Sequence, residues 1–241
     1  MKNLKIFAIA LSALVVLSGC SSMNSTTKGG ILGGSGGAVL GGIIGNLIGK
    51  DTKSTLIGAA IGTAVGTGAG VLIGKKMDKA KAAAEAIDNA TVETVTDHNG
   101  LKAVKVTFDS GILFKSGQST LDAAAKASLN DFANNVLKTN TDMDVAILGH
   151  TDNTGFKGVT SAEENARRNQ ALSLSRAQAV TKYLVSLGVS PSQIKSTEGM
   201  GQSDPVADNA TSAGKALNRR VEVYLYASED MINKANAGTL E

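Results

Sequence analysis

An acidic residue and an arginine are the clearest candidates for a binding site in this sequence. Asp152 closes a Gly-His-Thr-Asp segment that follows the apolar run 145–148, and the run predicts a buried strand with Asp152 in a polar turn at its C-terminal edge. On the helix expected next, Asn169, Ser173 and Arg176 are spaced i, i+4 and i+7 and share one stripe. A carboxylate and a guanidinium that converge can hold the ammonium and the carboxylate of a small zwitterion.

A hydrolase is the competing interpretation, and the sequence offers little for it. The chain has two histidines, His98 and His150, and one cysteine, Cys20. No serine lies in a nucleophile-elbow motif, and no His-Glu cluster has the spacing of a zinc site. We therefore expect a binding protein with no catalytic residues, no metal and no cofactor.

The N-terminus has the order of an export signal. A basic start precedes the apolar run 6–17, which is too short to span a bilayer. The following Leu-Ser-Gly-Cys motif resembles the bacterial lipobox, which implies cleavage before Cys20 and a diacylglycerol on its thiol. A lone cysteine cannot form an intrachain disulfide, which favours lipid attachment over a cleaved signal with a free thiol. Ser21 in the next position implies, by the same resemblance, sorting to the outer membrane.

Glycine dominates the segment after a flexible tether at 20–28. The stretches 29–49 and 54–74 are uncharged, and in the second every fourth residue from Gly58 to Gly74 is glycine. Such helices can pack closely, and each would be about 31 Å long, close to the hydrocarbon thickness of a bilayer. We expect a membrane-associated helical hairpin within 29–76, which resembles glycine-zipper regions of lipoproteins. Because glycine weakens helices, an oligomerising segment outside the bilayer and a flexible linker stay open.

The rest of the chain predicts an α/β sandwich, in which helices pack on one mixed sheet, over residues 91–241 with its core at 100–227. A linker helix at 77–90 precedes it. An Asn-Gly pair between two alternating stretches is a hairpin signal. The expected elements are strands at 91–95 and 102–108, a helix capped by Ser119 or Thr120 and ending near Lys138, a strand at 144–148, a helix at 162–187 ended by Gly188, and strands at 194–197 and 220–226.

Spaced motifs in this half of the chain resemble the OmpA-like C-terminal domain, a periplasmic peptidoglycan-binding module. The matching pieces are Gly149-His150-Thr151-Asp152, Asn169 with Leu172-Ser173 and Arg176-Ala177, Gly199-Met200-Gly201 with Pro205, and Asn218-Arg219-Arg220-Val221-Glu222. The resemblance implies that Asp152 holds the ammonium of diaminopimelate and Arg176 its carboxylate. It makes Thr151, Asn169, Leu172 and Ser173 contact or wall positions, and Arg220 either a lining residue or a brace. The loop 156–168 is longer than the resemblance leads us to expect.

These expectations combine into one functional hypothesis. The formal net charge of +3, without a basic patch interleaved with aromatic residues, argues against a nucleic-acid partner. We expect a lipid-anchored outer-membrane protein whose periplasmic domain binds the peptidoglycan stem peptide and tethers the outer membrane to the cell wall. The alternative is a structural oligomer, membrane-associated and built by the glycine segment. Homo-oligomerisation is compatible with both.

Overall fold

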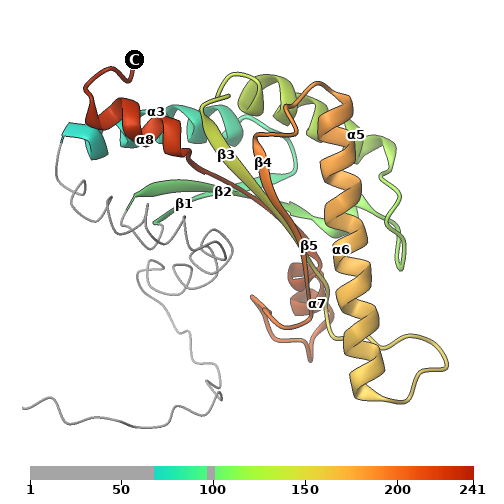
Figure 1. Cartoon of the computed structure of the whole chain (residues 1–241). Helices are drawn as coiled ribbons and strands as arrows, with labels where there is room; N and C mark the ends of the chain where they lie inside the picture. Colours follow the sequence, from blue (N-terminus) through green and yellow to red (C-terminus); the bar gives the residue numbers. More distant parts are fainter. Residues whose placement is uncertain (1–67, 97–100) are drawn as a thin grey trace, which may run out of the picture. The chain divides into compact units, whose positions relative to one another are not determined.

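The computed structural model describes residues 68–96 and 101–241 (Figure 1). The expected lipidation site Cys20, most of the predicted zipper and the Asn-Gly turn at 99–100 lie outside the described residues. Within the described ranges, no helix is both long enough and apolar enough to cross a membrane.

A five-stranded mixed sheet forms the centre of the described part, with strand order β1-β2-β5-β3-β4. β3 and β4 are parallel, whereas the other neighbouring pairs are antiparallel. The strands are β1 (Ala90–Thr96), β2 (Lys102–Asp109), β3 (Met143–His150), β4 (Ile194–Gly201) and β5 (Arg220–Ala227). The C-terminal ends of β3 and β4 therefore lie side by side, at the edge where the sequence placed Asp152.

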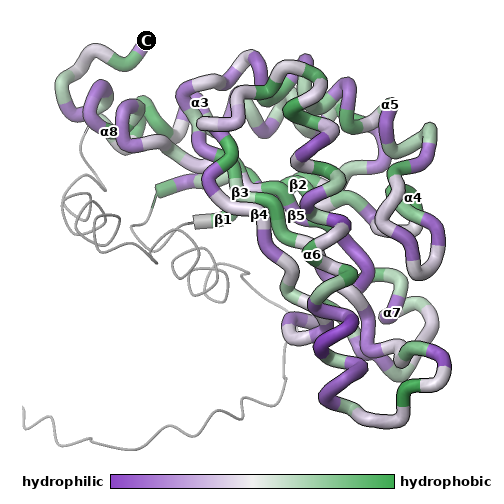
Figure 2. Tube along the Cα trace, turned by 45° about the vertical axis from the view of Figure 1, so that its right-hand side comes forward, coloured by the Kyte–Doolittle hydropathy of each residue, from purple (hydrophilic) through white to green (hydrophobic). Residues whose placement is uncertain are grey.

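Helices cover one face of this sheet, which confirms the predicted sandwich (Figure 1). The helices of the described part are α3 (Gly68–Glu85), α4 (Ser110–Leu113), α5 (Ala123–Phe132) continued by the π-helix η1 (Ala133–Leu137), α6 (Ala162–Ser186), α7 (Ser212–Asn218) and α8 (Glu229–Asn236). All of them except α7 contribute buried residues to the main core. Alternate residues of β5 separate the two faces, because Val221, Val223 and Leu225 join the main core with the helices, whereas Tyr224 and Tyr226 join a smaller cluster. Figure 2 shows the central strands in hydrophobic colours and most of α6 in hydrophilic ones.

Several local expectations differ from the structure. The helix cap is Asp122, whose side chain accepts an N–H of the first turn of α5 at 3.0 Å. The prediction of Ser119 or Thr120 was wrong because Leu121 forms a β-bridge with Phe114, which keeps this stretch extended. The short helices α4 and α7 and the C-terminal helix α8 were not predicted. Gly188, with a φ of 93°, follows α6 as the sequence indicated.

The helix α3 crosses the boundary that the sequence suggested between residues 76 and 77. Ile73 and Met77 lie on either side of it, and each is 1% exposed within the main core. Lys76 Nζ lies 2.6 Å from an Asp142 carboxylate oxygen and fastens the helix from outside. The end of the glycine segment is thus continuous with a helix of the sandwich, and the exact domain boundaries stay predictions.

Two glycines let α6 rest directly on the strands beneath it. Gly149 of β3 and Gly199 of β4 are partners in register. A Cβ at Gly149 would lie 2.1 Å from the carbonyl oxygen of Ser173, and one at Gly199 would lie 2.4 Å from the backbone nitrogen of Leu174. Because neither position has room for a side chain, the helix lies close to the C-terminal ends of β3 and β4 and fixes the residues that project from it there.

Candidate functional site

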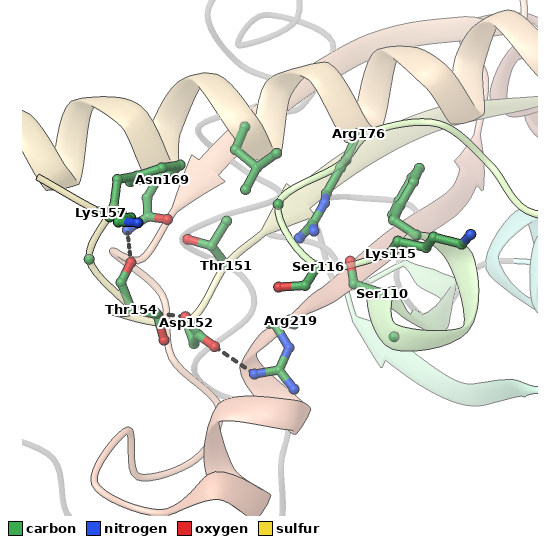
Figure 3. A pocket seen from close by; sticks show the side chains of 16 residues that line it. Ser110, Lys115, Ser116, Thr151, Asp152, Thr154, Lys157, Asn169, Arg176 and Arg219 are labelled. Atoms are coloured by element: carbon green, nitrogen blue, oxygen red, sulfur yellow. Dashed lines mark hydrogen bonds and ion pairs between the residues drawn. The ribbon is translucent and has the colours of Figure 1, made fainter.

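A pocket of about 660 Å³ lies at this edge of the sheet (Figure 3). Its walls come from the loop after β3, from α6, from α4 with the loop that follows it, and from the residue between α7 and β5. The lining residues used below are Ser110, Phe114, Lys115, Thr151, Asp152, Phe156, Lys157, Asn169, Leu172, Arg176 and Arg219.

Asp152 supplies the carboxylate of the pocket and is 5% exposed. Its Oδ1 accepts the N–H of Thr154 at 2.8 Å, and its Oδ2 accepts a hydrogen bond from Arg219 Nη1 at 2.6 Å (Figure 3). Burial alone would raise the pKa of Asp152, but the hydrogen bonds from Arg219 and Thr154 outweigh it and hold the pKa below its ordinary value. The side chain is therefore an anion at neutral pH.

Arg176 supplies a guanidinium that enters the same pocket from α6 and is 3% exposed. Its Nε donates to the carbonyl oxygen of Gln118 at 3.0 Å, and its guanidinium carbon lies 5.3 Å from the centroid of the Phe114 ring. Desolvation lowers the pKa of Arg176, and the charge of Arg219 adds to this effect, yet an arginine stays protonated in proteins. Among the described residues, the terminal nitrogens of Arg176 have no hydrogen-bond partner.

The structure brings three more predicted residues to the pocket. Asn169, Leu172 and Arg176 follow one another at i, i+3 and i+7 on α6 and all line it. The Asn169 side-chain amide donates to the carbonyl oxygen of Thr154 at 3.2 Å and so holds the loop that carries Asp152. The buried hydroxyl of Thr151 also lines the pocket and has no hydrogen-bond partner among the described residues.

Ser173, in contrast, does not line the pocket. Its hydroxyl accepts the N–H of Gly201 at 2.9 Å and donates to the carbonyl oxygen of Gln170 at 2.8 Å. It faces β4, because this side of α6 is the one that lies on the two glycine positions of the sheet. The role that the structure gives Ser173 is to join helix and strand.

Arg220 also lies outside the pocket, and its geometry is that of the brace rather than of the lining residue. It is 3% exposed, and its Nε donates to Glu222 Oε1 at 2.8 Å. Burial would raise the pKa of Glu222, but the charge of Arg220, the hydrogen bond from Tyr224 and the nearby His150 ring, whose Nε2 lies 3.4 Å from Glu222 Oε2, hold it far below its usual range. The hydroxyl of Tyr224 donates to Glu222 Oε2 at 2.7 Å. These side chains form a buried polar network that is separate from the residues lining the pocket.

Arg219 is a pocket residue that the sequence analysis missed, like Ser110 and Phe114. The Asn-Arg-Arg motif was noted, but only Arg220 was given a role, because a local motif does not show which arginine faces the pocket. In the structure, Asn218 determines which arginine faces the pocket. Its side-chain oxygen accepts hydrogen bonds from the N–H groups of Val206 and Ala207 at 2.8 and 2.9 Å, and these bonds anchor the end of α7. Arg219 follows in extended conformation and reaches Asp152 (Figure 3).

The long loop at 156–168 is partly helical. α6 begins at Ala162, so residues 162–168 are its first turns, while Phe156 and Lys157 line the pocket. The side-chain oxygen of Asn165 accepts the N–H of Phe156 at 2.7 Å and ties the loop to the helix. Glu164 pairs with two arginines of the same helix, whose hydrogen bonds lower its pKa to about 2.

Comparison with known families defines two regions of the chain. Residues 113–219, which include most of the pocket, match the OmpA family. Residues 1–78 match the YMGG-like Gly-zipper. The chain thus carries an OmpA family domain on its C-terminal side and a YMGG-like Gly-zipper on its N-terminal side, as the sequence motifs indicated. This family assignment agrees with a non-catalytic binding domain.

Known relatives match about half of this chain. Outer membrane protein A of Bordetella avium is 35% identical over 126 residues, which are 52% of this chain and 59% of that protein. The protein named "Probable lipoprotein YiaD" of Escherichia coli is 37% identical over 116 residues, 48% of each chain. The peptidoglycan-binding protein ArfA of Mycobacterium tuberculosis is 39% identical over 123 residues, 51% of this chain and 34% of that protein. The chain therefore spans roughly a third to three fifths of these relatives.

Solved structures share the fold. A MotB-like protein from Desulfovibrio vulgaris superposes with a TM-score of 0.52 at 20% identity, over 71% of this chain and 96% of that one. The periplasmic domain of Helicobacter pylori MotB gives a TM-score of 0.50 at 19% identity, over 64% of this chain and 90% of that one. At these identities the likeness establishes the architecture alone.

Proposed function

We propose that this protein binds peptidoglycan, without cleaving it, through the free zwitterionic end of diaminopimelate in the stem peptide. The observation that carries the proposal is the convergence of Asp152 and Arg176 on one pocket from two different elements (Figure 3). Both charges are buried, and each is held in place by the scaffold rather than by the other. A carboxylate and a guanidinium held at separate positions in one pocket suit a ligand in which an ammonium and a carboxylate are attached to the same carbon.

The chemistry of the ligand end follows from the groups around the pocket. A carboxylate such as Asp152 accepts charge-assisted hydrogen bonds from an ammonium, and the planar fork of Arg176 matches a carboxylate. The ring of Phe114 supports the guanidinium by a cation–π contact. Leu172 offers an apolar wall to the methylene chain between the two ends of diaminopimelate.

Two hydroxyls add capacity for the peptide part of the ligand. The side-chain oxygens of Thr151 and Ser110 are buried, line the pocket and have no partner among the described residues. Buried polar atoms in proteins are normally hydrogen-bonded. Neither oxygen is exposed to solvent in the free protein, so a small shift of its side chain would be needed for it to pair with a peptide amide in the pocket.

We further propose that the chain is a lipoprotein of the outer membrane, acylated at Cys20, with its binding domain in the periplasm. The lipobox-like motif supports this, as do relatives named an outer-membrane lipoprotein and an outer membrane protein. The relative named as peptidoglycan-binding supports the ligand. A protein held by lipid at one end and by peptidoglycan at the other would tether the two layers.

Sedimentation with insoluble sacculi tests this function. The mature chain, in detergent, is mixed with purified sacculi that contain diaminopimelate, and both the pelleted protein and the soluble fragments are measured over time. We expect the parent to pellet and to release no fragments. Protein that stays in the supernatant would refute the binding proposal, and soluble muropeptides that accumulate with time would support the hydrolase instead.

A further inference from the structure

The carboxylate proposed to receive the ammonium already has a cationic partner. Asp152 Oδ2 is paired with Arg219 at 2.6 Å, and Oδ1 is taken by a backbone N–H. A ligand ammonium therefore enters a place that a guanidinium occupies. It must share Asp152 with Arg219 or displace it.

We propose that Arg219 is a specificity-determining residue that makes the pocket select a zwitterionic ligand end, as in diaminopimelate, over the lone ammonium of a lysine side chain. This inference rests on the proposed function and names a residue that decides its ligand class.

The charge balance of the pocket gives the physical reason. The pocket contains one carboxylate, on Asp152, and two guanidinium groups, on Arg176 and Arg219. The three side chains therefore carry a net charge of one positive unit. A lysine ammonium raises this total and brings no anion. A zwitterionic end leaves the total unchanged, because its carboxylate pairs with Arg176 while its ammonium meets Asp152. The lysines Lys115 and Lys157, also in the lining, increase the penalty for an unaccompanied cation.

Burial strengthens the effect of these charges on the affinity for a ligand. Asp152 and Arg176 are 5% and 3% exposed, so their charges interact through a medium of lower dielectric than water. The effect is smaller for Arg219, whose side chain is 38% exposed and partly screened by solvent. A difference of about tenfold in relative affinity is in keeping with one partly exposed charge next to a buried site.

Arg219 is also placed to move without disturbing the fold. Among the described residues, Asp152 is the only ion-pair partner of its side chain. Its backbone, in contrast, is fixed, since its carbonyl oxygen accepts the N–H of Ser110 at 2.9 Å and Asn218 anchors the residue before it. The guanidinium can therefore leave Asp152 for solvent or for a ligand carboxylate while the chain around it stays in place.

The test compares two stem tripeptides that differ only in the third residue, meso-diaminopimelate or lysine. Binding of each to the full mature chain in detergent is measured by calorimetry, and the quantity of interest is the ratio of the two dissociation constants. In the parent, the diaminopimelate peptide should bind more tightly. In Arg219→Gln, the lysine peptide should gain and the ratio should fall by about tenfold. Arg219→Lys keeps the positive charge and should keep most of the preference.

Lys215→Gln is the matched control. Lys215 lies one helical turn before Arg219, outside the pocket, and has no ion-pair partner among the described residues, so its loss changes net charge equally. It should leave the ratio at the parent value.

The outcomes separate the two proposals. If the parent binds neither peptide, the proposed function fails and this inference fails with it. If the parent prefers diaminopimelate and Arg219→Gln keeps that preference, the proposed function stands and the role of Arg219 is refuted. Equal weakening of both peptides in Arg219→Gln also refutes it, because it would show a general contact rather than discrimination.

Discussion

Replacing Asp152 with asparagine removes the anion from the pocket and keeps its shape. In the parent, Oδ1 accepts the N–H of Thr154 at 2.8 Å and Oδ2 accepts from Arg219 at 2.6 Å. The amide oxygen of asparagine can keep the first bond. Its NH₂ group is a donor and would face the donors of Arg219, so the second bond is lost.

The expected loss of binding is larger than the expected loss of stability. A charge-assisted hydrogen bond to a ligand ammonium is worth about 1.5 to 3 kcal/mol, which predicts binding weaker by about tenfold to a hundredfold. The pair with Arg219 contributes only about 1 kcal/mol or less to folding, since the Arg219 side chain is 38% exposed and free to turn to solvent. The melting temperature should thus fall by only a few degrees.

Calorimetry with a soluble diaminopimelate stem peptide, beside a thermal melt of the same preparation, measures both quantities. Glu164→Gln is the control, because it removes a half-buried acid that pairs with arginines of its own helix and lies outside the pocket. It should bind within about twofold of the parent, less than the change expected for one lost hydrogen bond. Asp152→Asn binding as tightly as the parent would refute the reasoning, and a collapse of the melting temperature would show that Asp152 holds the fold instead.

The pH dependence of the Asp152 contribution has a defined sign. Its pKa in the folded protein is lower than in the unfolded chain, so its stabilising effect is fully present above the unfolded pKa of about 3.9 and is lost as the pH falls through the folded value. Comparison of the parent with Asp152→Asn in urea should show a constant stability difference from pH 7 to pH 5, declining only at more acidic pH. A difference that is already lost near pH 6 would contradict an anion held by Arg219.

Three further predictions concern the scaffold and the anchor. Gly149→Ala puts a methyl group 2.1 Å from the carbonyl oxygen of Ser173 and should lower the free energy of unfolding by more than about 2 kcal/mol in chemical denaturation; an unchanged midpoint would show that α6 is not held this closely. Cys20 should be the acylated first residue in mass spectrometry of the mature protein, and an unmodified cysteine or another N-terminus would exclude the anchor. Leucine at both Gly62 and Gly66 should reduce crosslinked oligomers or membrane retention of a chain without Cys20, and parental behaviour in both assays would indicate a linker.

The sequence was sufficient to predict the central strands of this domain, because the periodicity of hydrophobic residues follows directly from which residues are buried. A strand was expected at 220–226, and its alternating apolar residues Val221, Val223 and Leu225 form part of the main core. The apolar run 145–148 predicted a strand that carries Asp152 to the sheet edge, and this strand is β3.

Other features depend on contacts between distant residues and were out of reach. The cap of α5 could not be assigned because the pairing of Leu121 with Phe114, which keeps the preceding residues extended, is not visible in a local pattern. A helical stripe predicted Ser173 beside Arg176, but the close approach of α6 to Gly199 turns Ser173 toward the sheet. The choice of Arg219 over its neighbour as a pocket residue depends on the anchoring of α7, a tertiary contact.

In the proposed function, Arg176 binds the carboxylate that lies beside the free ammonium of diaminopimelate. The direct measurement is a two-by-two comparison of the parent and Arg176→Lys, each titrated with a stem peptide whose carboxylate at that end is free or converted to an amide. Amidation should weaken binding to the parent by at least about tenfold, and it should weaken binding to Arg176→Lys far less, because lysine keeps the charge but lacks the bidentate fork. Equal effects of amidation on both proteins would contradict the account and place that carboxylate elsewhere.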